Sequence, residues 1–92
     1  MKPDDTSQAV TEAMPGVRQV ACFDTAFHAG LPAAAATYAL PHQWRERYGL
    51  RRYGFHGLSH SYAARRAGEL SPGASRLVTC HLGAGASLCA VL

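Results

Sequence analysis

Three short segments of this sequence combine polar side chains with glycines and aromatic residues: 23–28, 53–60 and 80–87. Each places a polar residue where a predicted strand ends or a predicted helix begins, as with Asp24 in the first segment and His56 in the second. Anion sites are often built at such junctions, because unpaired backbone amides point out of them. The sequence therefore predicts a site for a ligand that carries phosphate.

The third segment contains the candidate phosphate cradle, Gly83-Ala84-Gly85. Two glycines spaced by one residue permit positive φ angles and let backbone amides approach an anion closely, and Ser87 can add a hydroxyl. The alternative is an ordinary hairpin turn, because glycine is common in turns. Both interpretations predict a glycine loop between two strands.

Asp24 and His56 are the candidate reactive side chains. Asp24 follows an apolar stretch, and its alternative role is to cap the turn that comes next. His56 lies between Phe55 and Gly57 before a predicted helix, where its imidazole can donate a hydrogen bond to a phosphoryl oxygen.

The other histidines are expected to support these two. His60, four residues after His56, can share a helical face with it, which would suit a metal pair. No third ligand lies nearby in the sequence, so a structural role for His60 is favoured. We expect His28 to support Asp24, and His42, at the start of a helix, to face the solvent.

Arg51 and Arg52 lie beside Tyr53 and have three open interpretations. They can clamp a phosphate, stack on aromatic rings, or form a solvated basic strand. No catalytic role is assigned to either.

The N-terminal third is expected to deliver Asp24 to the site. Residues 1–7 read as a mobile lead-in, followed by a short helix around 9–14 that Pro15 and Gly16 stop. Residues 17–23 become fully apolar and predict a strand of a covered sheet. Asp24 would then lie at the carboxyl end of that strand, where ligands bind in open α/β sheets.

The rest of the chain predicts two helices and a hairpin. After an alanine-rich connection, Pro41 can open a helix through 44–48 that Gly49 closes. Ser59 can cap a second helix, which ends at 71–73. Residues 76–81 and 86–92 are rich in strand formers and predict a hairpin around the glycine loop.

Composition indicates a soluble protein, and the length suffices for one small domain. The 92 residues are 48% hydrophobic with no apolar run long enough for a membrane helix and no signal-peptide pattern, so a cytoplasmic location is expected. The net charge of +3 is scattered, which argues against nucleic-acid binding. Cys22, Cys80 and Cys89 fit neither a disulfide framework nor a zinc site, and we expect them to be buried thiols.

In this order, the FDTAFH, YALP, RYGFHG and CHLG segments resemble those of the acetate kinase (acetokinase) family. The resemblance runs from about Met14 to Leu92, roughly a quarter of such an enzyme. It implies an α/β fold, a partial actin-like or sugar-kinase-type ATPase fold, spanning the end of the first half and the start of the second. Residues 1–15 would be a lead-in and short helix, and 16–92 an incomplete α/β segment.

The resemblance also implies site roles. His81, Leu82, Gly83, Ala84 and Gly85 would contact ATP phosphates. Asp24 would be the active-site carboxylate and His56 the stabiliser of the transition state. A carboxylate substrate is already ionised at neutral pH and needs no base, so we expect Asp24 to position Mg²⁺ or the acceptor.

Two positions depart from the family pattern. Ala84 replaces a usual asparagine, which removes an amide that can reach a phosphate oxygen or water. Leu58 replaces a usual threonine, which removes a hydroxyl near His56.

The function implied is reversible phosphoryl transfer from ATP to a short-chain carboxylate, acetate first and propionate second, in an enzyme that is commonly homodimeric. The isolated 92 residues are expected to be inactive. Two alternatives stay open: a non-catalytic remnant of an acetokinase, and a small metal-binding protein that uses His56, His60 and His81.

Overall fold

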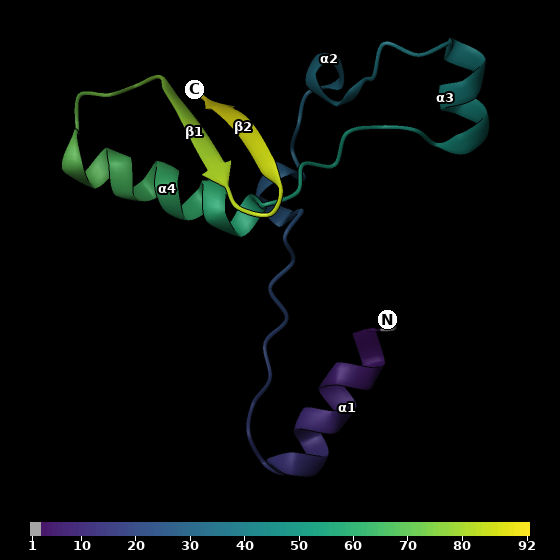
Figure 1. Cartoon of the computed structure of the whole chain (residues 1–92), viewed down its shortest axis with the longest axis vertical. Coiled ribbons are helices and arrows are strands. Elements are labelled where there is room, and N and C mark those ends of the chain that lie inside the picture. The colour runs from purple at the N-terminus through teal and green to yellow at the C-terminus, as the bar shows by residue number, and fades with distance from the viewer. Residues whose placement is uncertain (1–2) are drawn as a thin grey trace.

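The computed structural model describes residues 3–92 as a chain of separate small elements (Figure 1). Their order is α1 (Pro3–Ala13), the short 3-10 helix η1 (Ala26–His28), α2 (Ala33–Ala36), α3 (His42–Tyr48), α4 (Gly57–Leu70), β1 (Leu77–Leu82) and β2 (Ala86–Val91). The overall class is mixed α/β, as expected.

The two strands form the predicted hairpin. β1 and β2 are antiparallel, with Thr79 opposite Cys89 and Leu82 opposite Ala86 at the loop. Residues of β1 alternate between the covered and the open face, as a half-buried strand requires. The covered face lies against α4, and the first turn of α4 lies beside η1 (Figure 1). This unit of η1, α4 and the hairpin holds the candidate site.

Helix α4 begins two residues before the predicted cap Ser59. The residue before the helix is His56, whose backbone adopts the left-handed conformation with φ 59° and ψ 25°. No side chain of His56 caps the helix, so the first amides need another acceptor. The helix ends at Leu70, before the predicted Ser71-Pro72-Gly73 stop.

The N-terminal arm differs from the sequence prediction in two ways. Met1 and Lys2 lie outside the described residues, and from Pro3 onward the expected mobile lead-in is already part of α1, since proline fits the first turn of a helix. Residues 17–23 are extended but are not a strand, because the two strands of the described residues pair only with each other. In Figure 1, this segment stands apart and leads from α1 to η1.

Helices α2 and α3 belong to the segment that connects η1 to α4, and this segment extends away from the hairpin (Figure 1). Arg52 ties its two ends together: its amide donates to the Ala36 carbonyl at 2.7 Å, and its guanidinium donates to the Ala35 carbonyl. The Arg52 guanidinium also stacks over the Tyr38 ring at 4.9 Å, which confirms the stacking interpretation for this arginine.

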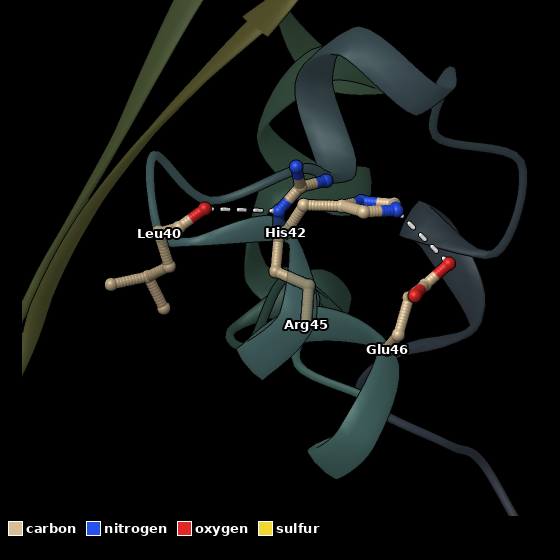
Figure 2. A network of polar contacts seen from close by, with 4 residues as sticks. All are labelled: Leu40, His42, Arg45 and Glu46. Carbon is tan, nitrogen blue, oxygen red and sulfur yellow. Dashed lines mark hydrogen bonds and ion pairs between the residues drawn. The ribbon is translucent and has the colours of Figure 1, made fainter.

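Helix α3 follows the predicted boundaries closely. Pro41 precedes its first residue, and Gly49 ends it in the left-handed conformation at φ 60°. Figure 2 shows Arg45 donating through Nε to the Leu40 carbonyl at 3.2 Å and His42 pairing with Glu46 at 3.0 Å. The His42 side chain is 70% exposed, so the expectation that it faces solvent is confirmed.

Little of this chain is buried. In the part that the structure describes, the buried residues are Ala36, Gly57, His60 and Thr79. The Cα radius of gyration is 17.2 Å, against about 12 Å for a compact domain of this length. The chain is therefore an open arrangement, and the least exposed of its described side chains is the polar His60.

The cysteine prediction is wrong in one respect. All three are free thiols, but Cys22 and Cys80 are exposed and Cys89 is half-buried. The physical reason is that, within residues 3–92, no second layer covers the outer face of the hairpin or the extended arm. None of the described helices is long and apolar enough to cross a membrane.

Candidate functional site

Asp24 caps helix α4 from a distance. Its Oδ2 accepts a hydrogen bond from the His56 amide at 2.7 Å, and its Oδ1 accepts one from the Leu58 amide at 3.2 Å. Amides at a helix start are orphan donors, so the carboxylate satisfies what the chain itself leaves open. These hydrogen bonds, first from Leu58 and then from His56, hold the pKa of Asp24 below its ordinary value of 3.8.

This cap refines the sequence interpretation. A capping role was the alternative for Asp24, but the expected target was the next turn. The structure shows instead a helix that begins more than thirty residues later. Asp24 thereby fixes the backbone of the other candidate residue, His56.

Gly57 allows this close approach. A Cβ atom at Gly57 would overlap the backbone oxygen of Asp24 and lie 3.3 Å from the Cβ of Phe27. No other residue type fits without moving one of the two segments. The glycine in the FHG sequence is therefore required by packing, which the sequence alone did not indicate.

A series of hydrogen bonds links His56 to the buried side chains of His60 and Thr79. The buried His60 bonds through Nδ1 to the Thr79 hydroxyl at 2.8 Å and through Nε2 to the Ser87 hydroxyl at 2.8 Å. Ser87 in turn bonds to Nδ1 of His56 at 2.9 Å. His60 is 1% exposed, and this burial lowers its pKa below the ordinary 6.5. The structural role expected of His60 is confirmed.

His56 and His81 form a stacked pair at the glycine loop. Their ring centroids are 4.0 Å apart and the rings are 12° from parallel. A Cβ atom at Gly85 would lie 3.6 Å from Nε2 of His56, and one at Gly83 would lie 3.3 Å from Nε2 of His81. The Cε1–Nε2 edge of His56 and Nε2 of His81 thus lie beside the loop that was predicted to cradle phosphate.

The backbone conformation of the loop differs from the prediction. Neither Gly83 nor Gly85 has a positive φ angle. The Gly83 amide donates to the Gly85 carbonyl at 2.8 Å, which closes the turn. The small size of these glycines, rather than their backbone freedom, admits the imidazoles. Leu82 and Ala84 are exposed around this turn.

Sequence reasoning missed Thr79 and misplaced two serines. Ser59 bonds to Nδ1 of His81 at 2.9 Å instead of capping α4. Ser87, expected to contact phosphate, is engaged by His56 and His60. A threonine on the covered face of a predicted strand was the available signal for Thr79, but nothing in the sequence showed which helix would face it.

His28 lies near the site but supports it through packing. A Cβ atom at Gly54 would overlap the His28 ring, and that ring meets the His60 ring edge-on at 6.0 Å. Gly54 also has φ 78°, so glycine is required there twice over. The expected support of Asp24 by His28 stays a prediction.

A groove of about 660 Å³ opens beside His56. Its size is within the range of small-ligand sites. Arg51 lines it, with the guanidinium over the Tyr53 ring at 5.2 Å. The groove is lined by 16 residues, including His28, Tyr38, Arg52, His60 and Ser87. It joins the basic segment to the histidine network.

The described residues offer no ready metal site. No group of three His, Cys, Asp or Glu side chains in this part of the chain is arranged to hold a metal ion. His56, His60 and His81 are instead joined by stacking and by a shared serine. The metal-binding alternative therefore gains no support from the geometry.

Comparison with known proteins gives a consistent result. Residues 5–92 match the Acetokinase family. The acetate kinase of Halothermothrix orenii is 52% identical over 84 residues, which are 88% of this chain and 21% of that protein. The acetate kinase of Methanosarcina acetivorans is 55% identical over 86 residues, 90% of this chain and 21% of that protein.

A solved structure agrees with these sequence matches. The crystal structure of Porphyromonas gingivalis acetate kinase superimposes with a TM-score of 0.80 at 44% identity, over 91% of this chain and 22% of that chain. The chain thus spans about one fifth of the length of the curated relatives that it matches. With 88 of its 92 residues matched in sequence, the chain belongs to the acetokinase family.

Proposed function

We propose that this chain carries part of a site for phosphoryl transfer between ATP and a short-chain carboxylate, with acetate as the first choice and propionate as the second. The product would be an acyl phosphate and ADP. The segment would span the end of the first half of an actin-like or sugar-kinase-type fold and the start of the second.

One observation carries this proposal: the stacked His56 and His81 bring the Cε1–Nε2 edge of one ring and Nε2 of the other to the glycine loop. Phosphoryl transfer is catalysed mainly by positioning and by donors aimed at developing negative charge. An imidazole next to a glycine loop can supply such a donor while the small residues leave room for the anion. His81, Leu82, Gly83, Ala84 and Gly85 would line the nucleotide phosphates.

Asp24 would act through position. Its carboxylate fixes the amides on either side of Gly57, so it sets where the His56 ring stands relative to the loop. A ring displaced by about 1 Å can lose a large part of its effect on rate, on the order of a hundredfold.

ATP and Mg²⁺ are the proposed cofactors on family grounds, but the residues present do not build a magnesium site by themselves. Asp24 is the carboxylate at the site, and both of its oxygens already accept backbone amides. Magnesium commonly needs further carboxylate, phosphate or water oxygens. No step described for this chain depends on a metal.

A non-catalytic remnant is the second candidate for the chain on its own. The radius of gyration and the exposed apolar arm favour it, because an enzyme of this class needs groups from elsewhere held in register. Acetate or propionate, ATP and a second acetokinase subunit are the partners expected of the complete protein.

The test is a graft of residues 5–92 into the Halothermothrix orenii acetate kinase, in place of its matching segment. A hydroxamate assay with ATP, Mg²⁺ and acetate should show turnover for the graft and none for the 92-residue chain. In the graft, His56→Ala should lower kcat and kcat/KM together by about 10²–10³-fold while the KM for ATP changes little.

The exposed His42 provides the control, since His42→Ala should leave both constants unchanged. A large rise in KM at constant kcat would instead make His56 a ground-state binding residue. Turnover by the isolated chain that Asp24→Ala abolishes would refute the remnant interpretation.

A further inference from the structure

The donor and acceptor of each hydrogen bond between Thr79 and His56 can be assigned in turn, starting from Thr79. The Thr79 hydroxyl donates to the Cys89 carbonyl at 3.5 Å, across the hairpin pair that these two residues form. A hydroxyl has one hydrogen, so Thr79 then accepts from Nδ1 of His60 at 2.8 Å. His60 therefore carries a proton on Nδ1.

His60 passes this direction on to Ser87. Its burial and lowered pKa keep it neutral, so it has one proton, already placed on Nδ1. Nε2 must then accept from the Ser87 hydroxyl at 2.8 Å. With its hydrogen used, Ser87 accepts from Nδ1 of His56 at 2.9 Å.

We propose that Thr79, His60 and Ser87 are positioning residues that hold His56 in its Nδ1–H form, leaving Nε2 to face the glycine loop. Neutral His56 then has a lone pair at Nε2 and can only accept there. It donates to an anion at the loop only as the imidazolium, which carries a second proton on Nε2. The consequence for phosphate rests on the proposed function, whereas the tautomer does not.

The test reads the imidazole nitrogens of the 92-residue chain directly, by long-range ¹H–¹⁵N NMR correlation at a pH where the histidines are neutral. We expect the Nδ1–H form for His56 and His60. His42, whose Nε2 lies 3.0 Å from the Glu46 carboxylate, should show the Nε2–H form in the same spectrum.

Thr79→Val is the decisive variant, because residue 79 is linked to His56 only through the side chains of His60 and Ser87. Without the threonine hydroxyl, His60 should move its proton to Nε2 and donate to Ser87, and Ser87 should donate to His56. Both histidines then change to the Nε2–H form in most molecules. Thr79→Ser should retain the original forms, and Ser59→Ala, which removes the partner of His81, should leave His56 unchanged.

An Nε2–H form of His56 in the unmodified chain would overturn the proposal. So would a His56 that keeps Nδ1–H when Thr79→Val has changed His60, or histidines that all share one averaged mixture of forms. Absent turnover in the grafted enzyme would count against the proposed function and leave the tautomer result standing.

Discussion

Two regions of the molecule differ in burial. One is the unit formed by η1, α4 and the hairpin, and the other is the N-terminal arm. In the first, His60 and Thr79 are buried and bonded, and no described buried side-chain polar atom lacks a partner. In the second, Val20 is 82% exposed and Phe23 is 67% exposed. The buried polar groups of the first region, which we call the polar centre, all have hydrogen-bond partners within the described residues. The apolar side chains of the arm are covered by none of these residues.

This difference separates the part of the chain that its own hydrogen bonds hold together from the part that they do not. Hydrogen bonds of the centre close within the described residues, so its geometry is set by the chain itself. Apolar residues in an extended segment gain stability only when another surface covers them. The chain spans about one fifth of the length of its relatives, and none of the described residues covers the apolar side chains of the arm.

Gly57→Ala should have the largest effect, because its Cβ atom would overlap the Asp24 backbone oxygen. We expect a loss of more than about 3 kcal/mol in the free energy of unfolding of the unit formed by η1, α4 and the hairpin. Urea titration followed by circular dichroism measures it. The matched control is Gly68→Ala on the same helix, where the Cβ atom meets nothing. That change should stabilise the helix by about 0.5–1 kcal/mol.

If both alanine variants behaved alike, the Asp24–Gly57 contact would not be what joins η1 to α4. The polar centre would then be no better connected than the arm.

His60→Ala should have the next largest effect. It removes a buried ring and leaves the Thr79 and Ser87 hydroxyls without that partner, at an expected cost of about 2–4 kcal/mol. His42→Ala, at an exposed position of α3, should change the unfolding free energy by less than about 0.5 kcal/mol. Similar values for the two variants would mean that the histidine network does not stabilise the unit.

Acid should destabilise the centre in two steps. The pKa of His60 is depressed in the folded chain, so its contribution is fully present above pH 6.5 and is lost as the pH falls through the lower folded pKa. The pKa of Asp24 is depressed as well, so a second loss should begin below pH 3.8. Thermal melts across this range should show both.

Asp24→Asn should remove the second, more acidic step and keep the first, since the amide cannot be titrated. An unchanged acid limb in this variant would show that the Asp24 cap is not linked to stability.

Val20→Ser should have the smallest effect. In the isolated chain the side chain is already in solvent, so the unfolding free energy should change by less than about 0.5 kcal/mol. In the grafted acetate kinase, the same change should cost about 1–3 kcal/mol if the remaining protein covers the arm. Equal small effects in both backgrounds would mean that the arm stays exposed in the complete enzyme.

Local sequence signals predicted much of the secondary structure. The hairpin around Gly83–Gly85, helix α3 between Pro41 and Gly49, and the end of α4 before Ser71 all follow from turn and capping residues close by in the chain. The motifs also identified the family, since 88% or more of the chain aligns with acetate kinases. These features depend on neighbours within a few residues, which a sequence displays.

The tertiary structure decided everything that depends on distant partners. Residues 17–23 have the composition of a strand, but a strand requires a neighbour, and the described chain supplies none. Asp24 caps a helix far along the chain, and Gly57 is fixed by the close approach of the Asp24 segment. Ser87 joins His56, which precedes α4, to His60 within it. The sequence displays which polar groups are present. Their mutual distances, and with them the tautomer of His56, arise only when the segments pack together.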